Sequence, residues 1–328
     1  MRTVHLSRTP IAGAPLFAAK LLDEAGHPSC VFAPTKYPDG REFNLWQDWD
    51  GVKAFDAPHE AELAGADVLV VYNNTSRAGW VEAWMRRKNS VLIYCSQPES
   101  IRWREAERGG VPAATWASYH ATVFRPARND CPISVLPQLI PIRHSLYSPL
   151  PWLEKREMNV GLPRIGYSPS NTSEQNYGDT YWDGKGYETT AGVLARLSNE
   201  GICKAMVVTG LPHADGMSLK RRADYWIDEV VTGAYHKNTL EALSVGACPV
   251  LNLKTAVEVV VERVYGAVFP HFAATLERLE SALRALPREP DALRWYARMC
   301  RDWTELFNDP ADLIRRYYLP FFEKGTRL

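Results

Sequence analysis

Residues 231–250 read VTGAYHKNTLEALSVGACPV, and the order of residue types in this stretch decides the fold. It predicts the end of a strand, a polar loop, a short helix over 239–245 that Gly246 terminates, and a buried strand over 248–252. Glu241 falls in the first turn of that helix, beside backbone N–H groups that attract anions. Such a turn suits a nucleoside diphosphate whose sugar is held through its hydroxyl groups.

Two interpretations of Glu241 remain open. Its carboxylate can accept hydrogen bonds from both hydroxyl groups of a ribose. Alternatively, Asn238 is the N-cap of the helix and Glu241 reaches back to its amide, which is the capping-box pattern. In the preceding loop, Tyr235, His236 and Lys237 are predicted to lie over the sugar and the diphosphate. Asn238 is expected to belong to the same donor site.

The composition predicts a soluble protein without a general attraction for nucleic acid. The chain has 328 residues, enough for two domains of about 150 residues each. Basic and acidic residues number 38 each, so the formal net charge is zero. The basic run 220–222 is interpreted as a solvated helix face. No segment has the roughly 20 apolar residues of a membrane-spanning helix, and the N-terminus shows no signal-peptide core, so we expect a cytoplasmic location.

Alternating strands and helices predict an α/β fold with doubly wound parallel sheets. In the first half of the chain, continuous apolar runs with abrupt polar ends are typical of parallel strands buried on both faces. We predict strands over 2–6, 30–33, 67–72 and 90–95, and helices over 14–25 and 80–87.

A second alternating series follows a proline-rich segment, 126–164, which we interpret as a linker between two domains. We predict strands over 164–168, 204–209 and 227–231, helices over 186–198 and 218–225, and a helical region from residue 274 to the end. The predicted domains are residues 1–150 and 151–305, followed by a terminal helix, 306–328, that packs back on the first domain.

Ligands of such sheets bind beyond the carboxyl ends of the strands, so the residues that follow each strand are candidates for a site. Ser170 and Asn171 follow the strand over 164–168. Lys185, with a glycine on each side, opens the next helix and can meet a phosphate there. Gly210 permits close backbone approach, and His213 can contact a base or a phosphate. The alternative is a solvated lysine and an exposed histidine in a tight turn.

The first half offers a second set of candidates. Gly13 follows the first strand and can bring backbone amides near a phosphate or sugar, although the turn lacks the GxGxxG pattern of dinucleotide sites. His120 is a candidate polar group at the chemical centre, although a lone histidine is more often structural. Four residues that follow later strands are expected to line the opposite wall and meet an acceptor: Asn73, Asn74, Ser96 and Gln97.

Taken together, these segments resemble the GT-B fold of retaining, family-four-like glycosyltransferases, which carry a family 1 type C-terminal domain. The resemblance rests on residues 9–15, 135–141, 165–171, 185–186 and 233–249. It implies two Rossmann-like domains that face each other across a cleft. The N-terminal domain would bind the acceptor, and the C-terminal domain would bind the nucleotide-sugar donor.

The resemblance also implies roles for particular residues. Lys185 would neutralise the diphosphate, and Glu241 matches the second glutamate of the Glu-x7-Glu motif, which binds the ribose. Gly233 stands where the first glutamate of that motif would lie. This departure leaves two alternatives open, an altered donor or a lost activity. The arginine that usually accompanies the lysine has no clear match.

The function implied is transfer of a hexosyl or pentosyl group from a UDP- or GDP-linked sugar to an acceptor hydroxyl. The resemblance implies retention of configuration, with Lys185 and His120 as catalytic residues. No cofactor is expected, and no metal either, since the six cysteines lack zinc-ligand spacing. The acceptor is expected to be a saccharide or a modified (hydroxymethylated) DNA base. The alternatives are a nucleotide-sugar epimerase and an inactive nucleotide-sugar-binding protein of the same fold. The sequence does not indicate an oligomeric state.

Overall fold

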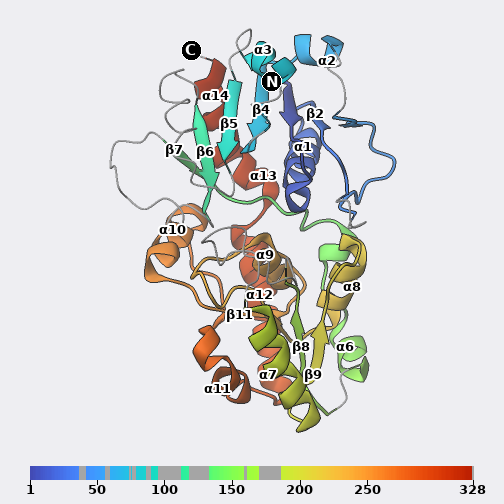
Figure 1. Cartoon of the computed structure of the whole chain (residues 1–328), viewed down its shortest axis with the longest axis vertical. Helices are drawn as coiled ribbons and strands as arrows, with labels where there is room; N and C mark the ends of the chain where they lie inside the picture. The colour runs from blue at the N-terminus through green and yellow to red at the C-terminus, as the bar shows by residue number, and fades with distance from the viewer. Residues whose placement is uncertain are drawn as a thin grey trace. The chain divides into compact units, whose positions relative to one another are not determined.

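The structure is a computed structural model of the whole chain (Figure 1). It describes residues 1–36, 42–55, 60–73, 75, 79–85, 90–94, 112–117, 133–158, 161–169 and 186–326. The chain divides into two compact units. Unit 1 comprises Met1–Pro141 and Asp309–Leu328, and unit 2 comprises Ile142–Asn308.

Unit 1 is built on a parallel sheet with the strand order β3-β2-β1-β4-β5-β6-β7. Its strands are β1 (Thr3–Leu6), β2 (Ser29–Phe32), β3 (Val52–Lys53), β4 (Val68–Tyr72), β5 (Ser90–Tyr94), β6 (Ala113–Trp116) and β7 (Ile133–Leu136). The helices in the first part of this unit are α1 (Ala14–Glu24), α2 (Glu60–Ala64) and α3 (Gly79–Met85). From β1 the chain first adds β2 and β3 on one side and then adds β4 to β7 on the other, which is typical of a doubly wound sheet.

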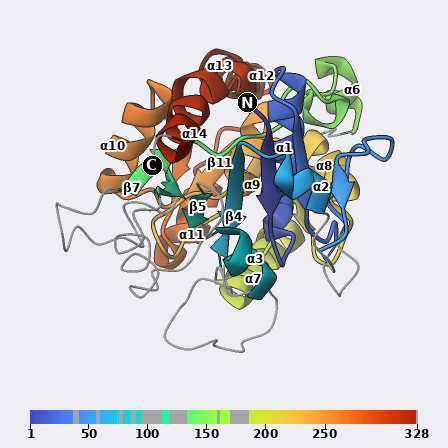
Figure 2. The ribbon, with the colours of Figure 1, turned by 90° about the horizontal axis from the view of Figure 1, so that it is seen from above.

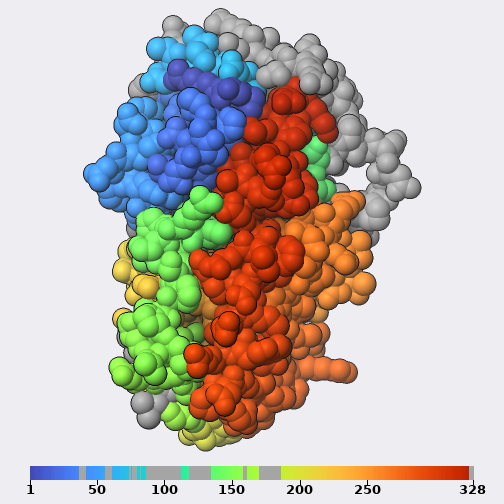
Figure 3. All heavy atoms as spheres, turned by 180° about the vertical axis from the view of Figure 1, so that it is seen from behind, coloured from blue at the N-terminus to red at the C-terminus, as the bar shows by residue number. Residues whose placement is uncertain are grey.

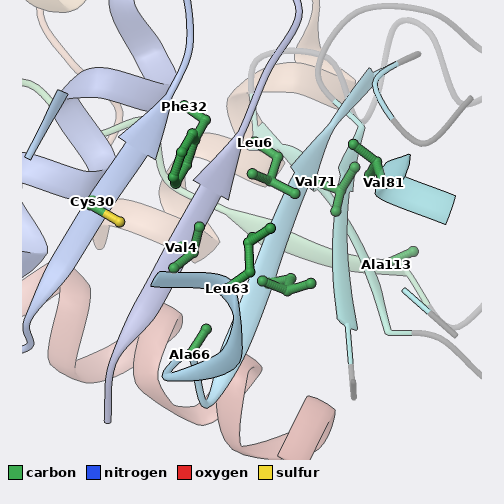
Figure 4. Close-up of a cluster of buried hydrophobic side chains, with 10 residues drawn as sticks. Val4, Leu6, Cys30, Phe32, Leu63, Ala66, Val71, Val81 and Ala113 are labelled. Carbon is green, nitrogen blue, oxygen red and sulfur yellow. The ribbon is translucent and has the colours of Figure 1, made fainter. Parts of the chain in front are cut away.

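One face of this sheet carries an apolar core because alternate side chains of a strand point to the same face. Val4 and Leu6 of β1 lie in it, beside Phe32 of β2 (Figure 4). Leu63 of α2 and Val81 of α3 cover the same layer and are fully buried. The apolar side chains at alternate positions of β1 therefore give α2 and α3 an apolar face to pack against.

The opposite face of β1 is polar yet buried. His5 is completely buried, and its Nδ1 lies 2.8 Å from the hydroxyl of Tyr72. Its Nε2 lies 3.1 Å from the hydroxyl of Thr3, which in turn lies 2.7 Å from the hydroxyl of Ser29. Burial lowers the pKa of His5 to about 3, so the ring is neutral at pH 7. These contacts join β1, β2 and β4 in one register.

The last residues of the chain complete unit 1. They form α13 (Pro310–Leu313), a π-helical turn (Ile314–Tyr318) and α14 (Leu319–Thr326). The Tyr318 hydroxyl donates a 2.7 Å hydrogen bond to the carbonyl of Pro137. Figure 2 shows α14 beside strands of the sheet, and α14 contacts β4 and β5. In Figure 3 the red surface of these residues adjoins the blue N-terminal surface, in keeping with the contact between α13 and α1.

Unit 2 contains a second parallel sheet with the order β12-β11-β10-β8-β9. Its strands are β8 (Arg164–Tyr167), β9 (Lys204–Val207), β10 (Tyr225–Ile227), β11 (Cys248–Leu251) and β12 (Phe272–Ala273). Its α-helices are α6 (Trp152–Met158), α7 (Tyr187–Asn199), α8 (His213–Arg222), α9 (Lys237–Ser244), α10 (Thr255–Tyr265), α11 (Leu279–Arg284) and α12 (Pro290–Phe307). The predicted α/β fold with two doubly wound, Rossmann-like sheets is confirmed.

Several predicted boundaries are wrong. The proline-rich segment is not a simple linker, because residues 133–136 form β7, the last strand of the first sheet. Helix α8 begins at His213 rather than at residue 218, and β10 covers 225–227 rather than 227–231. The aromatic residues at 225–226 belong to the buried strand, whereas the acidic residues at 228–229 lie in the loop that follows it. The units divide after residues 141 and 308, whereas the sequence placed these boundaries after 150 and 305.

Candidate functional site

The candidate site of unit 2 lies where β9 and β10 end. The residues after β9 lead into α8, and the loop Asp228–His236 leads from β10 into α9. Both strands pair in parallel with β8, so their carboxyl ends lie at the same edge of the sheet. This is the edge at which open α/β sheets bind ligands.

A buried ionic cluster, which we call the Glu241 cluster, joins α8 to α9. It consists of Glu241, His213, Lys220 and Lys237, each less than a tenth exposed at its side chain. Glu241 Oε1 accepts a 2.7 Å hydrogen bond from His213 Nε2 and lies 3.2 Å from Lys237 Nζ. Glu241 Oε2 accepts a 2.5 Å hydrogen bond from Lys220 Nζ. Both carboxylate oxygens are thus bound by basic side chains of the chain itself.

The charges of this cluster follow from burial and from its partners. Burial alone would raise the pKa of Glu241, but the two lysines and His213 together hold this pKa well below its usual range. Burial lowers the pKa of His213 to about 4, so its ring is neutral at pH 7. Burial also lowers the pKa of Lys237, against the opposing effect of Glu241. The side chains of two lysines face a single carboxylate in this cluster.

Further side chains hold the cluster in place. Lys220 Nζ also donates to Asn238 Oδ1 at 2.5 Å and lies 5.0 Å from the ring centre of Trp226. The Tyr147 hydroxyl lies 3.5 Å from Glu241 Oε1. Arg301 of α12 donates to the carbonyl of Tyr147 at 2.8 Å. The site is therefore assembled from α8, α9, α12 and the segment before α6.

The interpretation of run 220–222 as a solvated helix face is wrong for Lys220, whose side chain is 5% exposed. Sequence reasoning also missed Tyr147. One signal was available for Lys220. It lies seven residues after His213 and three after the buried Met217, which is the spacing of a single helix face. Its partner Glu241, on α9, lies 21 residues further along the chain, so no local sequence pattern links the two residues.

The capping-box interpretation is also wrong. Helix α9 begins at Lys237, and its N-cap is His236, so Asn238 lies inside the first turn. The carboxylate of Asp228 caps the helix instead. Its Oδ2 accepts hydrogen bonds from the backbone N–H of His236 at 3.0 Å and from the Thr239 hydroxyl at 2.5 Å. A carboxylate of the chain already occupies part of the electropositive helix N-terminus.

Glu229, the next residue, caps the loop in a similar way. Its Oε1 accepts backbone hydrogen bonds from Val231 at 2.8 Å and from Thr232 at 2.9 Å. His236 approaches both acids, with its Nδ1 3.6 Å from Asp228 Oδ1 and 3.8 Å from Glu229 Oε2. The two carboxylates are fully buried, whereas the His236 side chain is 15% exposed.

The structure explains why a glutamate is absent at position 233. Gly233 has φ +83°, a conformation that favours glycine. A Cβ atom added there would lie 2.4 Å from Cγ of Lys254, whose aliphatic chain covers this position. The backbone N–H of Lys254 also donates a 3.0 Å hydrogen bond to the Gly233 carbonyl. No acidic side chain fits at 233 without moving Lys254.

The structure buries the Tyr235 side chain in the core rather than leaving it exposed to a ligand. The ring packs edge-on against Phe269 at 5.3 Å, and the hydroxyl lies 3.4 Å from that of Tyr265. Gly210 lies in the turn after β9 with φ +66°, and no atom of the described residues lies within 4 Å of a Cβ added there. Its predicted ligand contact stays a prediction.

Unit 1 brings two of the predicted residues to the same edge of its sheet. Gly13 has φ +80° and follows β1, and Asn73 has φ +46° and follows β4. These strands are neighbours, and the backbone N–H of Arg8 donates a 2.9 Å hydrogen bond to the Thr75 hydroxyl across the two loops. The Cβ side of Gly13 is covered by Phe43, 3.1 Å from an added Cβ.

The remaining predicted site residues lie outside the described residues: Asn74, Ser96, Gln97, His120, Ser170, Asn171 and Lys185. The catalytic roles of Lys185 and His120 stay predictions. Within the described residues, no group of three or more His, Cys, Asp and Glu side chains is arranged to hold a metal ion. In the same part of the chain, no helix combines the length and apolar character needed to cross a membrane.

Comparison with solved structures identifies the fold. No protein-family model matches the sequence, and no curated protein matches it significantly. Sucrose-phosphate synthase from Thermosynechococcus elongatus is 13% identical with a TM-score of 0.59, over 98% of this chain and 99% of that one. HepE from Anabaena, solved with UDP-glucose, is 14% identical with a TM-score of 0.59 over the full length of both chains. WaaG, a glycosyltransferase of lipopolysaccharide biosynthesis, is 13% identical with a TM-score of 0.50, over 96% of this chain and 100% of that one. The chain has the GT-B fold.

Proposed function

We propose that the protein is a glycosyltransferase that moves a sugar from a nucleoside-diphosphate donor to an acceptor hydroxyl. The observation that carries the proposal is the Glu241 cluster, with its two buried lysines, at the ligand edge of unit 2 in a chain with the GT-B fold. The buried ammonium groups of Lys220 and Lys237 favour an anionic ligand, because charges interact more strongly at low dielectric. A diphosphate bound near α9 would experience this field together with the remaining N–H groups of the first turn.

The reaction places its main electrostatic demand on the leaving group. As the bond from the anomeric carbon to the diphosphate oxygen breaks, negative charge develops on the diphosphate. Lys220 and Lys237 would stabilise that charge through the field of the cluster, since their side chains are less than a tenth exposed. Lys185 is the group we propose for direct contact with the diphosphate, and His120 for the reacting centre.

The proposal includes several finer points. The donor is UDP- or GDP-linked, and UDP-glucose is the first to test because HepE is solved with it. We propose transfer of a hexosyl or pentosyl group with retention, no metal requirement and a cytoplasmic location. The acceptor would be a saccharide or a modified nucleic-acid base, with Asn73 on the acceptor side. Glu241 stays a candidate for the ribose contact, although that role requires its carboxylate to exchange one of its basic partners.

The test is a donor panel. We expect slow release of UDP or GDP from one nucleotide sugar in the absence of acceptor, and equal rates with and without EDTA. Adding candidate saccharides should raise the rate, and NMR of the product should show the anomeric configuration of the donor. Lys185→Ala should weaken donor binding. A folded protein that neither binds nor cleaves any nucleotide sugar would refute the proposal, and an epimerised donor would assign a different reaction.

A further inference from the structure

The sheet of unit 1 has a topological switch point between the neighbouring strands β1 and β4. From β1 the chain continues to β2 on one side, and from β4 it continues to β5 on the other side. The loops that follow these two strands therefore diverge at the carboxyl edge of the sheet. Open α/β sheets bind ligands at such a point. This edge belongs to unit 1, whereas the Glu241 cluster belongs to unit 2.

The backbone at this switch point is strained. Among the residues that the structure describes, the residues other than glycine with a positive φ all lie in these two loops. They are Ile11 (φ +45°) and Ala12 (φ +51°) after β1, and Asn73 (φ +46°) after β4. A β-branched residue such as isoleucine rarely adopts this conformation. Strain of this kind persists where the surrounding structure imposes it, and it is typical of ligand-binding loops.

Hydrogen bonds fix the turn that carries Arg8, directly after β1. The Ser7 hydroxyl donates a 2.7 Å hydrogen bond to the carbonyl of Thr9, across the turn. The backbone N–H of Ser7 donates to the carbonyl of Phe32 at 3.0 Å. The backbone N–H of Arg8 donates at 2.9 Å to the Thr75 hydroxyl in the loop after β4. Ser7 and Thr75 are buried, so the backbone of Arg8 is held between the two loops of the switch point.

The side chain of Arg8, in contrast, is exposed. Its guanidinium makes no hydrogen bond or ion pair with the residues that the structure describes. Arg315 and Arg316 of the same unit differ, because both pair with Asp312. A guanidinium is a planar fork of N–H donors without an acceptor, and it matches the oxygens of a phosphate or a carboxylate. The fixed turn therefore presents an anion-binding side chain at the ligand edge of unit 1.

We propose that Arg8 binds an anionic group, a phosphate or a carboxylate, on the acceptor, which is therefore an acidic saccharide. Arg8 is the contact residue, and Thr75 is a positioning residue that holds its backbone. This inference rests on the proposed function, because it names the class of acceptor for the same transfer. Arg8 lies beside the loop of Asn73, which we place on the acceptor side.

The surroundings of Arg8 favour a saccharide over a nucleic acid. Its neighbours in the turn, Ser7 and Thr9, carry no charge. A single arginine suits one anionic group, which it can hold through two parallel hydrogen bonds. A nucleic acid instead presents a row of phosphates, and its affinity comes from several basic residues along that row.

The test compares three sugars that share one ring: glucose 6-phosphate, glucuronate and glucose. Isothermal titration calorimetry of the full chain, with UDP present, measures the affinity for each. Wild type should bind one of the two charged sugars at least about tenfold more tightly than glucose, and which one it binds separates phosphate from carboxylate. Arg8→Gln should weaken that binding at least about tenfold and remove the preference over glucose. Arg8→Lys keeps the charge but not the fork, so its affinity should fall between the two.

Further variants separate contact from structure. Thr75→Val removes the acceptor of the Arg8 N–H and should weaken binding of the charged sugar less than Arg8→Gln does, whereas Thr75→Ser keeps a hydroxyl and should retain the wild-type preference. A merely structural role of Thr75 would lower the affinities for all three sugars alike. Arg294→Gln, at an exposed arginine of α12, is the matched control and should change none of them.

Other outcomes overturn the inference. Wild type that binds none of the three sugars, or binds glucose as tightly as both charged sugars, would refute it. Equal losses in Arg8→Gln and Arg294→Gln would show a general effect of charge. Weaker binding of UDP-glucose by Arg8→Gln, with the preference among the sugars unchanged, would place Arg8 on the donor. Tighter, Arg8-dependent binding of a DNA oligonucleotide than of either charged sugar would assign a nucleic-acid acceptor. In each case UDP-glucose binding by wild type would leave the proposed function standing, whereas no binding of any nucleotide sugar would refute both.

Discussion

Lys220→Met breaks the Glu241 cluster at its best-connected member. The substitution removes the 2.5 Å hydrogen bonds to Glu241 Oε2 and to Asn238 Oδ1, together with the cation–π contact to Trp226. Removing one partner of a buried ion pair costs about 3–5 kcal/mol, because the other charge stays buried. Lys237 and His213 still face the carboxylate, so we expect the lower end, about 3 kcal/mol.

Native-state hydrogen exchange measures this loss where it occurs. The amides of α8 and α9 report the local free energy of opening, which avoids the assumption that a chain of two units unfolds in one step. In thermal unfolding, about 3 kcal/mol corresponds to a decrease of roughly 6–12 °C for a domain of this size. Lys324→Met, at an exposed lysine of α14, is the matched control and should change neither quantity.

A double variant tests whether Lys220 and Glu241 are energetically coupled. In Lys220→Met with Glu241→Gln, the carboxylate no longer carries a charge, so the loss should be smaller than the sum of the two single losses. A destabilisation by Lys220→Met below about 1 kcal/mol, or strictly additive losses, would show that the cluster is not a buried ionic network.

Three further predictions follow from other parts of the structure. The pKa of His213 is about 4 in the folded protein and 6.5 ordinarily. Its contribution to stability is therefore present above pH 6.5 and is lost as the pH falls toward 4. His213→Gln should reduce the number of protons taken up on unfolding in that window by about one, which is measured from the slope of the unfolding free energy against pH. Gly233→Ala should destabilise unit 2 by about 1–2 kcal/mol in urea unfolding, because it forces a left-handed residue against Lys254, and an unchanged midpoint would contradict this. Tyr318→Phe removes the hydrogen bond to the Pro137 carbonyl and leaves that group buried, so unit 1 should lose about 1–2 kcal/mol, with no effect on hydrogen exchange in α9.

The sequence predicted the strands whose pattern is local. Residues 68–72 and 248–251 form buried strands, as their continuous apolar runs predict. Helix α1 ends at Glu24, before Gly26, as the helical spacing indicates. Strand β7 was missed because prolines 132 and 137 flank a run of only four residues. Its place as the last strand of the sheet is a tertiary property that no local pattern contains.

The candidate site shows the same division. Glu241 and His213 were expected in one site, and the structure joins them at 2.7 Å. The burial of Lys220 was not predicted, because it depends on a carboxylate 21 residues further along the chain. The reason for Gly233 was equally hidden, since Lys254 covers it from the start of another helix. Pairings of this kind are set by the packing of α8, α9 and α10, and a local motif does not report them.

The central claim is that unit 2 binds a nucleoside-diphosphate sugar. Isothermal titration of the wild-type protein with UDP-glucose and with GDP-mannose tests it most directly. We expect saturable binding of one of these donors at one site per chain, displaced by the corresponding nucleoside diphosphate. A correctly folded protein that shows no saturable heat with either donor at millimolar concentration, and no competition by UDP or GDP, would contradict it.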